Sequence, residues 1–212
     1  MTTQTEETQA LLITEHELIA LIALAGTDGA LRCQTLFRLD HAAGAPLEQA
    51  GVSTLLERGL MKIENDALQP VGPAATVTAV LADSTSWLET ALVTPSSEHV
   101  SFMFGAEQGA LLLNLSKYGV HELHPITGSD GMVTTAIQMA DYYLKQAPDG
   151  YPAAATTRRH FKDGTSRAVH VKAEADGSLS IAEGEGENLD SSALASEQLD
   201  SRIRAGLEQQ NA

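Results

Sequence analysis

Cysteine, basic residues and long apolar runs are scarce in this 212-residue chain, and each scarcity argues against a class of protein. Cys33 stands alone, so a disulfide framework is excluded, and a lone thiol fits a reducing cytoplasm. The opening MTTQTEETQ is polar and acidic, unlike a signal peptide. No apolar run approaches the length of a membrane span. We therefore expect a cytoplasmic protein without a membrane partner.

Basic residues are outnumbered by acidic ones, 13 to 28, which gives a formal net charge of −15. Such a charge disfavours binding to nucleic acid or to an anionic membrane. Five of the cations nevertheless lie within fifteen positions of one another: Arg158, Arg159, Lys162, Arg167 and Lys172. The first four of these are candidate partner-binding residues, for an acidic partner or for acidic regions of the chain itself. The alternative is that these cations blunt an edge strand against aggregation.

Catalytic and cofactor motifs are also missing. The chain has neither the GxGxxG pattern of dinucleotide sites nor the GxxxxGK[ST] pattern of a P-loop, and no Ser/His/Asp arrangement can be recognised from spacing. We expect no cofactor and no enzymatic activity, although a site assembled only in space would leave no such signal.

Two short segments contain possible metal ligands. His121 and His124 would share a face of a helix, but Val120–Ile126 has the pattern of a strand, where an odd separation sends the two rings to opposite faces. The acidic segment EGEGEN, residues 183–188, lacks the twelve-residue frame of a calcium loop and is interpreted as a flexible solvated loop. We expect no metal site at either place.

The first ninety residues predict a helical unit after a disordered tail at 1–10. Thr14 and Glu17 form a capping-box pattern at the start of a helix that Gly26 ends. The segment 30–39 is ambiguous between helix and extended chain. A second helix from Leu47 to Gly59, a two-stranded wing around Asn65-Asp66 and a third helix from Pro73 complete the unit.

The centre of the chain, 99–126, predicts three strands of a meander. Val100, Phe102 and Phe104 alternate with other residues, and the segment 110–115 is apolar at all but one position, as in a strand covered on both faces. Residues 132–146 then predict an amphipathic helix across one face of this meander, capped by Ser129 or Asp130.

The same order of elements recurs in the last third. Residues 155–161, 167–173 and 179–181 predict three strands joined by Asp-Gly turns, and Ser192 can cap a final helix with Ala195, Leu199, Ile203 and Leu207 on one stripe. The fold class is therefore α+β: a winged-helix-like N-terminal unit and an antiparallel sheet with two βββα halves. We expect boundaries at 11–90, 91–150 and 151–212.

Several segments resemble the EspG-type chaperones of actinobacterial type VII secretion, in the order in which that family has them. These are LITEHELIALIAL (12–24), GVSTLLERGLMKIENDALQP (51–70), AATVTAVLADSTSWLETAL (74–92), GALLLNLSKYGVHELHPI (109–126) and MVTTAIQMADYYL (132–144). The resemblance implies quasi-two-fold halves around a central sheet, no enzymatic activity, and binding of a helical hairpin destined for secretion. It transfers no individual binding residue.

Two functions follow as hypotheses. The first is a non-enzymatic chaperone or adaptor that covers the apolar face of a helical protein client, itself either a monomer or a homodimer. The alternative is a winged-helix transcriptional regulator, with 47–58 as recognition helix and a C-terminal sensing or dimerisation part. The segment 46–70 carries a net charge of −2, with Arg58 and Lys62 its basic residues, which disfavours a DNA-binding face.

Overall fold

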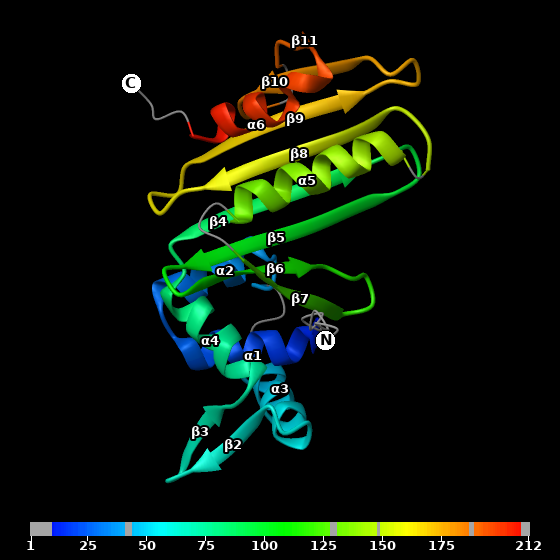
Figure 1. Ribbon diagram of the computed structural model, residues 1–212. Coiled ribbons are helices and arrows are strands. Elements are labelled where there is room, and N and C mark those ends of the chain that lie inside the picture. The colour runs from blue at the N-terminus through cyan, green and yellow to red at the C-terminus, as the bar shows by residue number, and fades with distance from the viewer. Residues whose placement is uncertain (1–9, 41–43, 128–130, 148, 187–188, 209–212) are drawn as a thin grey trace, which may run out of the picture. The chain divides into compact units, whose positions relative to one another are not determined.

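The structure is a computed structural model that describes residues 10–40, 44–127, 131–147, 149–186 and 189–208 (Figure 1). The chain forms two compact units, each discontinuous in sequence. The first unit contains residues 1–84 and 104–127, and the second contains 85–103 and 128–212. The chain thus passes from one unit to the other after residues 84, 103 and 127, and the second of these positions lies within the predicted meander. The expected tail lies almost entirely outside the described residues.

The first unit begins with a short strand that sequence periodicity did not predict. Strand β1 (Leu11–Thr14) pairs antiparallel with a strand more than a hundred residues away, β7 (Val120–Ile126). Helix α1 (Glu15–Ala25) follows directly. The Thr14 side chain accepts from the Glu17 amide, and the Glu17 carboxylate accepts from the Thr14 amide, so the predicted capping box is confirmed.

The helices and the wing of this unit follow the predicted order. The ambiguous segment is helix α2 (Asp28–Leu36), capped by Thr27, and helix α3 (Ala45–Glu57) starts slightly earlier than expected. The wing consists of β2 (Met61–Glu64) and β3 (Ala67–Pro70), joined by two residues with positive φ, Asn65 and Asp66. Helix α4 (Pro73–Asp83) has its proline in the first turn, as predicted.

The predicted meander is confirmed. Its strands are β5 (Glu98–Ala106), β6 (Gly109–Asn114) and β7, and the first unit orders its strands β1-β7-β6-β5. Leu111 and Leu113 are buried, whereas Leu112 is half-buried, so burial is strongest on one face of β6. The Phe37 and Phe104 rings pack 5.3 Å apart in the core of this unit.

The second unit is a sheet with the order β5-β4-β8-β9-β10-β11. Strand β4 (Ser86–Val93) was not predicted as a strand, whereas β8 (Ala153–His160), β9 (Ser166–Ala173) and β10 (Leu179–Glu183) were. Helix α5 (Gly131–Gln146), whose expected caps lie outside the described residues, packs on β4 and β8, as Figure 1 shows.

The end of the chain differs from the prediction in one respect. Ser192 does not cap a helix, because it begins the short strand β11 (Ser192–Leu194), which pairs with β10. A turn of 3-10 helix (Ser196–Gln198) leads to α6 (Leu199–Glu208), which buries Leu199, Ile203 and Leu207 against β9. Ala195 is exposed. The element order after α4 is therefore ββββα, twice, rather than βββα.

The α+β class is confirmed. No helix in the described residues combines the length and the apolarity needed to cross a lipid bilayer.

Candidate functional site

The predicted cationic segment forms the end of β8, the turn after it and the start of β9. In the register of these strands, Arg159 lies opposite Arg167, and Arg158 lies opposite Ala168. Residues directly opposite one another share a face of a sheet, and neighbours in a strand do not. Arg159 and Arg167 therefore project from one face, and Arg158 projects from the other.

Arg158 takes part in an ion-pair network on its face of the sheet. Its Nη1 lies 3.3 Å from Glu89 Oε2 on β4, and its Nε donates to Glu185 Oε1 at 3.0 Å. His160 Nε2 lies 3.3 Å from the same Glu89 oxygen, and Ser166 donates to Glu185. The network connects β4, β8, β9 and the acidic loop, so the charge of Arg158 is used within the fold.

Electrostatics favour the charged forms of Glu89 and Arg158 in this network. Burial alone would raise the pKa of the Glu89 carboxyl, but the hydrogen bond from His160 and the charge of Arg158 lower that pKa overall. Burial would likewise lower the pKa of Arg158, but its hydrogen bond with Glu185 and the two nearby carboxylates raise it. Glu185, in the segment interpreted as a solvated loop, is therefore held to the sheet.

The edge-strand alternative for the cations does not hold. Strand β8 lies between β4 and β9, and β9 lies between β8 and β10. Both strands are interior in the second unit, so their cations have no edge to protect.

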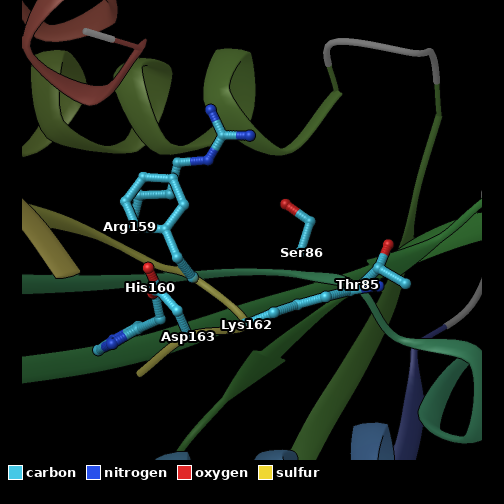
Figure 2. A pocket seen from close by; sticks show the side chains of 7 residues that line it. Thr85, Ser86, Arg159, His160, Lys162 and Asp163 are labelled. Carbon is cyan, nitrogen blue, oxygen red and sulfur yellow. The ribbon is translucent and has the colours of Figure 1, made fainter. Parts of the chain in front are cut away.

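A shallow depression of about 350 Å³ lies where β4 begins and β8 ends. It is lined by Thr85, Ser86, Arg159, His160, Phe161, Lys162 and Asp163, shown in Figure 2. The antiparallel pairing of β4 with β8 brings these segments together, because Trp87 lies opposite His160. The structure thus brings Arg159 and Lys162 of the predicted set to one site, which we call the basic depression.

Two cations and two hydroxyl groups give the basic depression its chemistry. The Arg159 guanidinium lies over the Phe161 ring, 5.6 Å from its centroid, and points to the same side as the Ser86 hydroxyl (Figure 2). The Lys162 side chain extends toward Thr85. Within the described residues, neither Arg159 nor Lys162 forms an ion pair with a carboxylate.

Asp163 is the acidic residue of the depression, and its carboxylate is engaged locally. Its Oδ1 accepts from the Thr165 hydroxyl at 2.6 Å and from the Thr165 amide at 2.9 Å. These two hydrogen bonds lower the pKa of Asp163. The arrangement as a whole can hold an anion between a planar guanidinium, an ammonium group and hydroxyl donors.

The two histidines of the His-Glu-Leu-His segment lie as predicted on opposite faces of β7. His121 is buried, and its Nδ1 accepts from the Ser116 amide at 3.1 Å. His124 is half-buried beside Glu122. Among the residues that the structure describes, no group of three His, Cys, Asp or Glu side chains is placed to hold a metal ion.

Several exposed apolar side chains lie in the first unit. Ile63 and Leu68 are directly opposite each other on the wing and are 65% and 36% exposed. Leu12 on β1 and Val120 on β7 are 51% and 42% exposed. In the register of β1 and β7 they project from the same face. Tyr118, 80% exposed, lies in the turn before Val120.

The basic depression was predictable only in part. The density of cations identified Arg159 and Lys162. Thr85 and Ser86 line the depression only because β4 pairs with β8. Since β4 was not predicted as a strand, nothing in the sequence indicated that these two hydroxyl residues belong to the site. Glu89 was missed for the same reason, although a glutamate within the apolar stretch WLETALV is a weak sign of a buried ion pair.

Comparison with known proteins gives a likeness of fold. No protein-family model matches the sequence, and no curated protein matches it. Among solved structures, the chain is similar to the type VII secretion system chaperone EspG5 of Mycobacterium tuberculosis, solved in complex with a PE25–PPE41 dimer. The TM-score is 0.54 with 12% sequence identity, over 96% of this chain and 99% of EspG5.

Proposed function

We propose that this protein is a non-enzymatic chaperone that binds a helical protein client, in the cytoplasm, before the client is secreted by a type VII-like system. The observation that carries the proposal is the fold likeness to EspG5, which extends over nearly the whole of both chains. EspG5 is a secretion chaperone in complex with a PE–PPE dimer. A protein client is the corresponding expectation for this chain, and the sequence resemblance implies that this client is helical.

The surface of the first unit supports the proposal. A chaperone for a helical client needs exposed apolar side chains with polar residues around them. The Ile63–Leu68 pair on the wing fits this need, because the Lys62–Glu64 ion pair flanks it. Leu12 and Val120 provide a second apolar surface of this kind.

The winged-helix alternative has less support. The two cations between residues 46 and 70 are both in ion pairs, Arg58 with Glu17 and Lys62 with Glu64. A phosphate-binding face needs cations that are available to DNA. No specific feature of α3 or the wing favours a nucleic-acid partner over a protein.

The experiment is affinity capture of the tagged chain from a nuclease-treated native lysate of its own organism, followed by mass spectrometry of the retained protein. We expect a small helical protein, or a pair of them, in stoichiometric amount. Retention of nucleic acid when nuclease is omitted, with no protein partner under either condition, would instead support the regulator.

A further inference from the structure

We propose that the basic depression binds the carboxylates of an acidic segment on the protein client. The inference rests on the proposed function for the identity of the partner. It assigns the site to Arg159 and Lys162, with the Ser86 and Thr85 hydroxyls as additional donors. Arg158 is left out, because Glu89 and Glu185 already pair with it.

The distribution of charge within the chain is the first reason. With a net charge of −15, most of the surface repels an acidic partner. Most cations of the described residues are already paired with carboxylates: Arg58, Lys62, Lys145, Arg158, Lys172, Arg202 and Arg204. Arg159 and Lys162 have no such partner there, and they line the same depression. An acidic segment therefore meets two neighbouring cations here that no carboxylate of the described residues neutralises.

The geometry of Arg159 is the second reason. The Arg159 guanidinium lies over the Phe161 ring, 5.6 Å from its centroid, and no carboxylate of the described residues pairs with it, so its N–H donors are available to a ligand. A carboxylate is the ligand that matches the edge of a guanidinium in a bidentate manner. Lys162 enters the depression from the turn and supplies a point charge on the side of Thr85 (Figure 2).

The dimensions of the site favour a protein segment over a nucleic acid. A depression of about 350 Å³ with two cations accommodates one or two side chains. A nucleic-acid strand would instead require a row of cations along a groove. The depression is also shallow, so that side chains of a partner lying on the surface can reach it.

Trp87 provides a built-in reporter of binding. It is the single tryptophan of the chain, it is 3% exposed, it follows Ser86 in strand β4, and it lies directly opposite His160 on β8. Because Trp87 lies opposite His160, which lines the depression, we expect a bound ligand to change the emission of the indole, and binding can then be followed without a label.

The test uses the full-length chain and an acetylated, amidated pentaglutamate peptide at low salt, with binding followed by Trp87 emission and by calorimetry. The variant R159Q/K162Q removes the two cations that line the depression. The variant K145Q/K172Q removes the same charge from two exposed, ion-paired lysines and is the matched control. We expect R159Q/K162Q to weaken peptide binding at least tenfold and K145Q/K172Q to change it less than twofold.

Three results of the binding experiment would overturn the inference. The wild-type chain could fail to bind the peptide, the two variants could lose the same affinity, or inorganic phosphate could bind with the same dependence on Arg159 and Lys162. Circular dichroism spectra of both variants check that the fold is retained. Failure here is distinguishable from failure of the proposed function, because the capture experiment measures client binding independently. A client retained by wild type and by R159Q/K162Q equally would refute the site and leave the chaperone function intact.

Discussion

Arg58 and Glu17 form an ion pair that connects the end of helix α3 to the capping box of helix α1. Arg58 Nη1 lies 2.6 Å from Glu17 Oε2, the oxygen that also accepts from the Thr14 amide. Arg58 Nη2 donates to the Leu12 carbonyl of strand β1 at 2.8 Å. One guanidinium thus joins α3, α1 and β1 in the first unit, and the Glu17 side chain is fully buried beneath it.

Removal of this guanidinium is expected to destabilise the chain. In R58M the buried Glu17 carboxylate keeps its Thr14 partner but loses its counter-ion, and the Leu12 carbonyl loses its donor. We expect the free energy of unfolding in urea to fall by about 2 kcal/mol. The matched control is R202M, which removes a half-buried arginine whose partner Glu183 is 35% exposed, and it should cost less than about 0.5 kcal/mol. Equal effects would contradict this role of Arg58.

The close contact of α1 with α3 is expected to tolerate no side chain at Gly51. A methyl group built there would overlap the His16 carbonyl oxygen, which is backbone and cannot move aside without moving the helix. We expect G51A to reduce the free energy of unfolding by about 3 kcal/mol. S53A alters an exposed serine two positions further along the same helix and should change the free energy of unfolding by less than about 0.5 kcal/mol. Thermal and urea unfolding of both variants measure the difference.

His121 is expected to make stability depend on pH. Burial lowers its pKa below the ordinary value of 6.5, and the charge of Glu15 opposes this only in part. The unfolded chain therefore binds a proton at a pH where the folded chain does not, so stability falls as the pH is lowered from about 6.5 through the folded-state pKa. Protonation would also remove the acceptor of the Ser116 amide.

The variant H121Q is expected to be less stable than wild type at pH 8. Its free energy of unfolding should also fall less than that of wild type between pH 7 and pH 5, as measured by urea unfolding at each pH. H124Q, which alters the half-buried histidine on the opposite face of the strand, should show the same change in the free energy of unfolding with pH as wild type. If the free energy of unfolding of H121Q changed with pH as it does in wild type, the pH dependence would belong to other groups.

The contact of Arg158 with Glu89 is expected to show energetic coupling. Both side chains are largely buried, and their pairing spans β4 and β8. A double-mutant cycle with E89Q, R158Q and E89Q/R158Q should give a coupling energy of about 1–2 kcal/mol. Additive effects of the two single substitutions would mean that the network contributes nothing beyond its separate members.

Local patterns in the sequence predicted most helices and strands of both units. The capping box of Thr14 and Glu17, the Asn65-Asp66 turn of the wing and the Asp-Gly turns of the last third all depend on neighbours within a few positions. Strands β1, β4 and β11 were missed because their identity depends on distant partners. Strand β1 also merges with the apolar run of α1, and β11 is three residues long.

The candidate site shows the same limit. The density of cations identified Arg159 and Lys162 but did not distinguish them from Arg158. Arg158 differs from them because strand alternation places it on the other face of the sheet, where it pairs with Glu89, 69 positions away. The hydroxyls of Thr85 and Ser86 likewise enter the site only through the pairing of β4 with β8.

The exposed apolar pair of the wing gives a prediction about the client. Ile63 and Leu68 are 65% and 36% exposed, so the free energy of unfolding of I63S/L68S should lie within about 1 kcal/mol of the wild-type value. If the wing contacts the client, the same variant should retain less than a tenth of the client in affinity capture. V93S, a single substitution of an exposed valine in the second unit, serves as the control. Undiminished capture by I63S/L68S would remove the wing from the client surface.

The most direct measurement of chaperone function is the solubility of the captured client, expressed alone and together with this chain. We predict that the client aggregates alone, becomes soluble with the chain, and elutes with it from a sizing column as a stoichiometric complex of high helical content. A client that is fully soluble without the chain, or that does not co-elute with it, would contradict the proposed function.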